Sequence, residues 1–172
     1  MGLTIEFYSA VPQELISLFA DDIDAPLDDE HMAVFLQKQQ TFPRAVFPPR
    51  LLLPDDLNTL CHILNKHHPL VPLRFEDACV KLLWDDGLGT EKLTLLSDQF
   101  AHALTECSKS DIEQSALAWA STFPSEEPLS SAPAYQAVLQ LQEIARDVIR
   151  SKKSLIYHLE GAPQFFDYLR YI

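Results

Sequence analysis

The sequence is organised around one ten-residue stretch, Lys81-Leu82-Leu83-Trp84-Asp85-Asp86-Gly87-Leu88-Gly89-Thr90. Two of the chain's four glycines lie here, between two segments whose apolar residues recur at helical spacing. Because glycine adopts left-handed backbone angles without a steric penalty, we predict that Gly87 caps one helix and that Gly89 turns the chain into the next. The stretch therefore predicts a helix-to-helix turn.

The segments on either side carry the apolar stripes on which this prediction depends. A helix is predicted to begin at Pro72 and to end before Gly87, and its stripe consists of Phe75, Ala78, Cys79, Leu82 and Leu83. After the turn, Thr90 is the predicted N-cap of a long helix, whose stripe consists of Leu93, Leu96, Phe100, Ala103, Leu104 and Cys107. Each stripe predicts one buried helical face.

Strands are predicted near the two ends of the chain. Residues 3–8 combine alternation with β-forming side chains, and residues 154–159 form a second such run before Gly161. Residues 41–54 contain four prolines, which is too many for the interior of a helix. An extended, irregular connection that packs against the body of the protein is expected there.

Further helices are predicted from their start signals and their apolar spacing. Ser110 and Glu113 form a capping box, which predicts a helix start at Ser110. The other predicted helices begin at Pro12 and Pro54, span residues 29–40 and 133–150, or form a short terminal helix from Pro163. The sequence thus predicts one α+β domain over residues 1–172, mostly helical with six to eight helices, and a small sheet formed by the N-terminal strand and a C-terminal strand.

The balance of charge limits the classes of partner. The chain has 25 acidic and 13 basic residues and a net charge of −12. Such a surface repels a phosphate backbone unless its basic residues cluster. The densest basic group lies at a predicted helix end, where cations stabilise the helix dipole, and consists of Arg146, Arg150, Lys152 and Lys153. We therefore expect no nucleic-acid partner, whereas a basic protein partner suits the charge.

The sequence favours a cytoplasmic location. No apolar run approaches the ~18 residues that span a bilayer, and the N-terminus lacks the basic and long apolar regions of a signal peptide. Cys61, Cys79 and Cys107 are an odd number of cysteines without C-x-x-C spacing, and each falls in an apolar stripe. Buried thiols are expected at these positions, and no membrane partner.

Trp84, Asp85 and Asp86 are candidate ligand-binding residues. An aromatic ring and two carboxylates beside two glycines are typical of a binding loop, and they equally suit a structural turn. A dinucleotide loop is excluded because the third glycine of the G-x-G-x-x-G motif is missing. The carboxylates also disfavour a phosphate cradle, because they repel an anion.

His102 is the fourth candidate ligand-binding residue. Asp98, His102 and Glu106 follow one another at intervals of four, so they share one helical stripe. A carboxylate–imidazole–carboxylate stripe can hold a metal or orient a general base, and it is also typical of a solvated polar face. The H-E-x-x-H motif is missing, and we predict neither a metal centre nor a cofactor.

Six acidic residues lie between positions 21 and 30. Asp28, Asp29 and Glu30 are predicted to start the helix over residues 29–40, because carboxylates favour a helix N-terminus. Asp21, Asp22 and Asp24 lie outside that explanation. They form a solvated loop or a site for a cation or a partner.

Both ends of the chain resemble the YfbM-like family of bacterial proteins. The start, Met1-Gly2-Leu3-Thr4-Ile5-Glu6-Phe7-Tyr8-Ser9-Ala10-Val11-Pro12-Gln13-Glu14-Leu15, is similar in its Met-Gly, short strand and Pro-Glu-Leu helix. The end is similar in its long helix, the turn over residues 150–153 and the strand over residues 155–159. Residues 78–84 and 93–113 follow the family's central helices more loosely. The resemblance covers about half the chain, implies an α+β fold, and implies no catalytic residue.

The leading functional hypothesis is a non-catalytic protein-binding or regulatory module with an acidic surface, because no catalytic motif is found. The rival hypothesis is an enzyme or small-ligand-binding protein with a site near Trp84, Asp85 and Asp86 or near His102. A homodimer is a further hypothesis. Its contact would be built on the apolar residues of the terminal helix, which are Phe165, Phe166, Tyr168, Leu169 and Tyr171.

Overall fold

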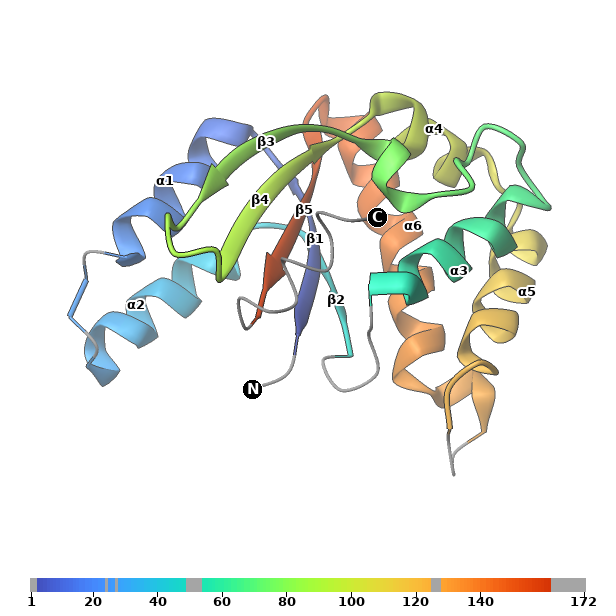
Figure 1. The fold of residues 1–172 in the computed structure, drawn as a ribbon, viewed down its shortest axis with the longest axis horizontal. Helices are drawn as coiled ribbons and strands as arrows, with labels where there is room; N and C mark the ends of the chain where they lie inside the picture. Colours follow the sequence, from blue (N-terminus) through green and yellow to red (C-terminus); the bar gives the residue numbers. More distant parts are fainter. Residues whose placement is uncertain (1–2, 24, 27, 49–53, 125–127, 162–172) are drawn as a thin grey trace.

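A five-stranded antiparallel sheet forms the centre of the described part of the protein, in the strand order β2-β1-β5-β4-β3. The computed structural model describes residues 3–23, 25–26, 28–48, 54–124 and 128–161. The strands are β1 (Thr4–Ala10), β2 (Arg44–Phe47), β3 (Cys79–Asp85), β4 (Glu91–Leu96) and β5 (Ser154–Glu160). Figure 1 shows helices on both faces of this sheet.

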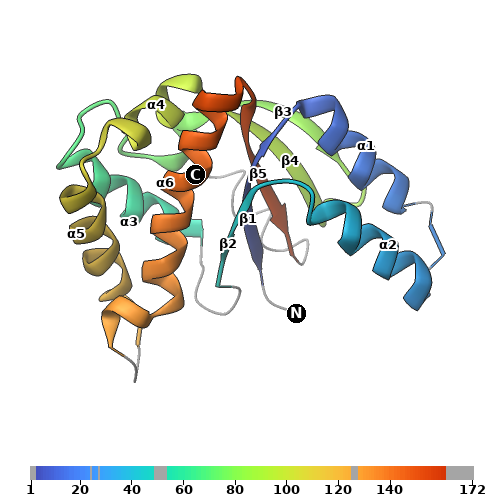
Figure 2. The ribbon, with the colours of Figure 1, turned by 180° about the vertical axis from the view of Figure 1, so that it is seen from behind.

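Six α-helices are formed by the described part of the chain. Two of them, α1 (Pro12–Ile23) and α2 (Asp29–Gln39), lie together on one side of the sheet (Figures 1 and 2). The other side carries α3 (Pro54–Asn65), α4 (Asp98–Glu106), α5 (Lys109–Ala120) and α6 (Pro133–Ser151). A short 3-10 helix, η1 (Phe75–Ala78), leads directly into β3.

The predicted fold class was wrong in its sheet. The sheet has five strands instead of two, because both segments around Gly87 and Gly89 are extended and β2 adds a fifth strand. Residues 79–85 form β3 in place of the helix predicted from Pro72. The long helix predicted from Thr90 is β4 followed by the shorter α4. The opening stretch is therefore a β-hairpin, and its glycines have φ values of 70° at Gly87 and 73° at Gly89.

Bulges explain why β3 looks helical in sequence. Its register against β4 shifts between Cys79 and Lys81 and again between Leu82 and Trp84. Each shift places two residues of β3 opposite one of β4 and breaks the strict alternation of a strand. The apolar residues are then spaced irregularly and match the helical period by coincidence.

The other predicted segments are close to those observed. The strands predicted at residues 3–8 and 154–159 are confirmed as β1 and β5, and they pair with each other along their length. The described part of the irregular connection predicted at residues 41–54 contains the strand β2, which pairs with β1. The predicted capping box is displaced, since α5 begins after Ser108, whose hydroxyl accepts from the backbone N–H of Asp111 at 3.1 Å.

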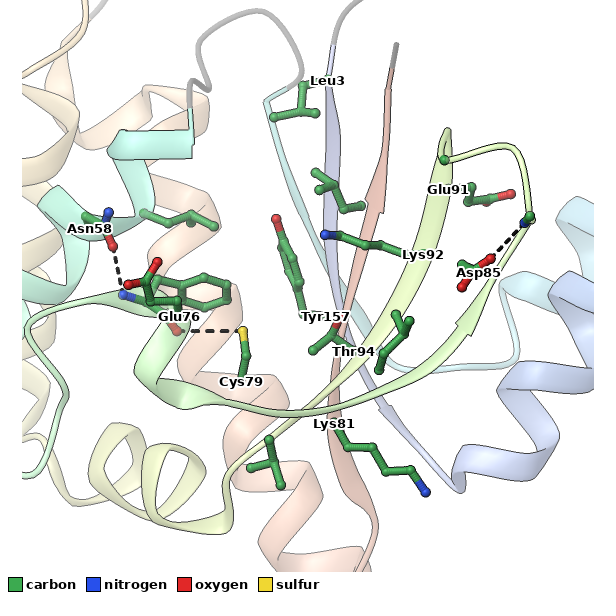
Figure 3. A pocket seen from close by; sticks show the side chains of 17 residues that line it. Leu3, Asn58, Glu76, Cys79, Lys81, Asp85, Glu91, Lys92, Thr94 and Tyr157 are labelled. Atoms are coloured by element: carbon green, nitrogen blue, oxygen red, sulfur yellow. Dashed lines mark hydrogen bonds between the residues drawn. The ribbon is translucent and has the colours of Figure 1, made fainter. Parts of the chain in front are cut away.

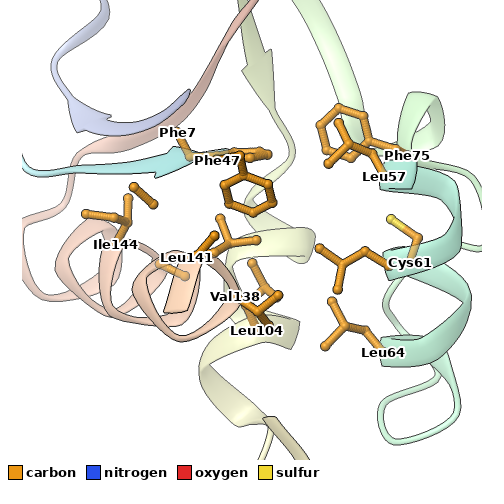
Figure 4. Close-up of a cluster of buried hydrophobic side chains, with 14 of the residues drawn as sticks. Phe7, Phe47, Leu57, Cys61, Leu64, Phe75, Leu104, Val138, Leu141 and Ile144 are labelled. Carbon is orange, nitrogen blue, oxygen red and sulfur yellow. The ribbon is translucent and has the colours of Figure 1, made fainter. Parts of the chain in front are cut away.

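Two apolar clusters hold the layers together. The larger lies between the sheet and α3 to α6, and Figure 4 shows Phe7 and Phe47 of the sheet facing Leu141 and Ile144 of α6. The smaller lies between the sheet and α1, where Phe19 packs against the Tyr8 side of the sheet. Alternation along β1 explains the two sides, because Ile5 and Phe7 point one way while Glu6 and Tyr8 point the other.

The state of the cysteines can also be compared with the one predicted from the sequence. Cys61 and Cys107 are buried free thiols as predicted, and Cys79 is a half-buried free thiol. In the described ranges, no helix is both long and apolar enough to cross a membrane. The terminal helix predicted from Pro163, and with it the predicted homodimer contact, lies outside the described residues.

Candidate functional site

Asp85 and Asp86 are used mainly to build the hairpin turn. The Asp86 carboxylate accepts hydrogen bonds from the backbone N–H groups of Leu88, Gly89 and Thr90, and from the Thr90 hydroxyl. Partial burial raises the pKa of Asp86, but these hydrogen bonds outweigh it and hold the pKa below its usual value. The Asp85 carboxylate accepts from the Gly87 N–H at 2.8 Å. Both acids therefore have a structural explanation.

Trp84 precedes Asp85 in β3, but its ring lies on the α1 side of the sheet, and His102 lies on α4. The Trp84 ring is half-buried and packs against Phe19 of α1, with 6.0 Å between the ring centroids. His102 is exposed on α4. Its predicted neighbour Glu106 accepts instead from His68, at 2.8 Å. The structure does not bring the four candidate residues together, and the described residues contain no group of three or more His, Cys, Asp or Glu placed to hold a metal.

A pocket of about 590 Å³ opens on the sheet face beside β3 (Figure 3). One wall is formed by α3 and η1, and the floor is formed by β5, β4 and β3. The apolar lining consists chiefly of Leu3, Leu57, Phe75, Leu82, Tyr157 and Leu159. Polar side chains include Asn58, Glu76, Asp85, Lys92 and Thr94. Of the four candidate residues from the sequence, Asp85 is the one that lines this pocket.

The pocket exists because the helices cover only part of this face of the sheet. Helix α6 packs on β1, β2 and β5. Beyond them, Thr94 of β4 and Leu82 of β3 face the pocket from the end of the sheet. Val80 and Leu82 of β3 remain 61% and 51% exposed. An open apolar surface on an edge strand is typical of a place where another chain binds.

The polar groups of the pocket wall hold the wall in place. The Asn58 side-chain oxygen accepts from the Phe75 N–H at 2.8 Å, and the Cys79 thiol donates to the Phe75 carbonyl oxygen at 3.7 Å. Burial raises the pKa of Cys79 to about 11, so its sulfur is a protonated thiol at neutral pH. A protonated thiol is a poor nucleophile, which favours binding over covalent catalysis at this site.

A buried polar network lies on the opposite face of the sheet. His158 of β5 lies between two carboxylates, with Nδ1 2.9 Å from Glu6 Oε2 and Nε2 2.8 Å from Glu91 Oε1. Because each ring nitrogen faces a carboxylate oxygen, both carry protons and the imidazole is a cation. Burial lowers the pKa of His158, but the two carboxylates outweigh it and raise the pKa to about 9.

Three more side chains complete this network around Glu6. The Tyr8 hydroxyl donates to Glu6 at 2.5 Å, Gln39 of α2 donates to the Tyr8 oxygen at 2.7 Å, and Arg44 of β2 pairs with Glu6 at 2.9 Å. Burial raises the pKa of Glu6, while the hydrogen bonds from His158 and Tyr8 together with the nearby positive charges bring it below its usual value. The side chains of Glu6 and His158 are almost fully enclosed, so the network ties strands and helices together and offers no open site.

Neither the network nor the pocket was predicted from the sequence. Glu6 and His158 each interrupt an apolar strand with a charged side chain, which is a signal of burial with a partner. The pocket gives no such signal, because Leu57, Phe75, Thr94 and Tyr157 come from four separate elements. No family model, curated protein or solved structure matches this chain.

Proposed function

We propose that this chain is a non-catalytic binding protein that holds an extended apolar segment of a partner protein in the pocket beside β3. The observation that carries it is the pocket's apolar floor next to the exposed edge strand, where Val80 and Leu82 are both more than half exposed. A segment seated there covers these two side chains as well as the floor. The burial of such apolar surface supplies the binding free energy.

The edge of β3 favours an extended partner segment. Among the described residues β3 is the last strand of the sheet, and no described strand pairs with its outer side. A partner strand can add to such an edge through main-chain hydrogen bonds while alternate side chains enter a pocket. The bulges that leave Val80 and Leu83 out of register shorten the regular part of this edge. We therefore expect the side chains in the pocket to contribute more affinity than a long ladder of hydrogen bonds.

The rival hypothesis of an enzyme or small-ligand site finds less support. Asp85 lines the pocket, but its carboxylate already accepts from the turn. Trp84, Asp86 and His102 are not among the residues that line it. Cys79 is the pocket's thiol, and its raised pKa keeps it protonated. A regulatory role through partner binding in the cytoplasm, with three free thiols, suits these features.

A pair of leucines on the same hairpin tests the proposed function. Wild-type protein is used to capture a stoichiometric partner from native extract at moderate salt, and the dissociation constant of the purified pair is then measured by calorimetry. Leu82→Glu places a charge in the pocket, so we expect it to weaken binding at least about tenfold, which is about 1.4 kcal/mol. Leu88→Glu is the matched control, because Leu88 is 78% exposed on the hairpin turn outside the pocket.

The same two variants also show which result would contradict binding in the pocket. Equal affinities for wild type, Leu82→Glu and Leu88→Glu would mean that the partner binds elsewhere. Failure to recover any stoichiometric partner would remove the support for a protein-binding role.

A further inference from the structure

The chain leaves the sheet at the rim of the pocket beside β3. Directly after β5, the Gly161 N–H donates to the Thr90 carbonyl oxygen at 2.8 Å. Gly89 and Glu91, on either side of Thr90, both line the pocket. Residues 162–172 lie outside the described ranges, but they continue from Gly161 and so start at this rim.

The floor of the pocket is enclosed like a protein core. Leu3, Tyr157 and Leu159 line the pocket, yet they are only 2%, 6% and 0% exposed (Figure 3). Val80 and Leu82 at the rim are instead more than half exposed. Because protein interiors leave few voids larger than a water molecule, an enclosed apolar floor favours an occupant that is in place when the chain folds. The rim stays open to a molecule that arrives from solution.

The segment that starts at this rim has the composition of such an occupant. The chain's aromatic share of 10% predicts about one aromatic residue in eleven, whereas residues 162–172 contain four. The large apolar residues of the segment are Phe165, Phe166, Tyr168, Leu169, Tyr171 and Ile172. Side chains of this kind bury more apolar area than any others, so we expect protein to cover them.

The segment is long enough to reach the floor. An extended residue advances by about 3.3–3.6 Å, so Phe165 and Phe166 lie within about 18 Å of Gly161 along the chain. Tyr157 lies four residues before Gly161 and Phe165 lies four residues after it. A segment that folds back over β5 can therefore bring the Phe165 ring over the Tyr157 side of the floor.

We propose that residues 162–172 fold back into the pocket beside β3 and act as an internal ligand, with Phe165 and Phe166 against the floor. The regulatory consequence rests on the proposed function. The partner's apolar segment first contacts the rim at Leu82 and then displaces residues 162–172 from the floor. The chain is thus autoinhibited, because only the fraction of molecules with an open pocket can bind.

Tethering decides between the chain's own segment and the same segment of a second copy. A segment attached at the rim of its pocket has an effective concentration in about the millimolar range, which exceeds the concentration of a second copy in dilute solution. The same aromatic residues were predicted to form a homodimer contact, and an adduct between two chains in the test below is the result that favours that contact.

Photo-crosslinking within the chain tests where the segment lies. A benzophenone amino acid replaces Phe166, or Tyr168 in a separate chain, and each protein is irradiated without partner at low concentration. We expect an adduct with the mass of one chain, mapped by mass spectrometry to pocket residues such as Phe75 or Tyr157. The same amino acid at position 117, an exposed site on α5, should give no adduct in the pocket. Adducts on α2, on α5 or between two chains would overturn the proposal.

Partner affinity tests the autoinhibition. The variant Phe165→Ser/Phe166→Ser should bind the captured partner at least about tenfold more tightly than the wild type, because its pocket stays open. Leu117→Ser is the matched control and should leave the affinity unchanged. A synthetic peptide of residues 162–172 should compete with the partner for the double variant. Equal affinities of wild type and double variant would overturn the proposal.

The two experiments separate this inference from the proposed function. Partner binding without any adduct in the pocket would contradict the internal ligand and leave the proposed function standing. An adduct in the pocket with no recoverable partner would support the internal ligand and contradict the proposed function. The crosslinking result stays decisive if the double variant fails to fold, because an aromatic replacement at position 166 keeps the character of the segment.

Discussion

Replacing His158 with alanine is expected to lower the free energy of unfolding at pH 7 by about 3–5 kcal/mol, because it leaves Glu6 and Glu91 without their shared cation. Glu6 is almost fully enclosed, so its carboxylate cannot recover the lost interaction from water. Urea denaturation followed by tryptophan fluorescence measures the change. His102→Ala is the matched control, since His102 is exposed on α4, and it should cost less than about 0.5 kcal/mol.

The pH dependence of stability gives this prediction a second readout. The pKa of His158 rises from 6.5 to about 9 on folding. A raised pKa means that its contribution is complete below pH 6.5, declines between pH 6.5 and 9, and is lost above that range. A rise in pKa from 6.5 to about 9 corresponds to about 3 kcal/mol of folding stability. The difference in stability between wild type and His158→Gln should shrink across this interval, and a difference that stays constant would contradict a charged His158.

Replacing Trp119 with alanine is expected to cost about 3–5 kcal/mol, because it removes a fully buried aromatic side chain. The ring contacts Phe47 and Phe123, and its N–H donates to the Asp56 carbonyl oxygen at 2.9 Å. That hydrogen bond fixes α5 to α3, the helix that supplies one wall of the pocket. Urea denaturation measures the loss of stability, and partner affinity should fall with it.

The variant Trp84→Ala is the control for Trp119→Ala. Its ring is half-buried on the other face of the sheet, so Trp84→Ala should cost distinctly less than Trp119→Ala. If Trp84→Ala lost as much stability as Trp119→Ala or more, the larger apolar cluster would not lie on the Trp119 side of the sheet, which would contradict the described fold.

The sequence predicted those elements that carry strong local signals. Prolines, caps or clear runs of β-forming residues mark where these elements begin or end, and the neighbouring residues favour the same structure. The elements are β1, β5, α1, α2, α3 and α6. The hairpin of β3 and β4 was missed because its bulges at Val80 and Leu83 replace alternation with irregular spacing. Gly87 was correctly predicted to take a left-handed conformation, but the predicted helix cap was wrong, because a hairpin turn also needs that conformation.

The functional surfaces were harder to predict for a different reason. Asp85 was identified from its place beside the glycines, and it does line the pocket. The remaining wall depends on where α3, η1 and β5 meet, which no local pattern encodes. The acidic run was visible in sequence, but its division between the last turn of α1 and the start of α2 depends on where α1 ends. The resemblance to the YfbM-like family stays a prediction.

The most direct test of the pocket is photo-crosslinking from its edge. A benzophenone amino acid is placed at position 82 or, in a separate chain, at position 88, and each protein is irradiated with its partner bound. We expect a covalent adduct from position 82, mapped by mass spectrometry to an extended apolar segment, and little or none from position 88. Equal adducts from both positions, or an adduct from position 88 alone, would contradict binding in the pocket beside β3.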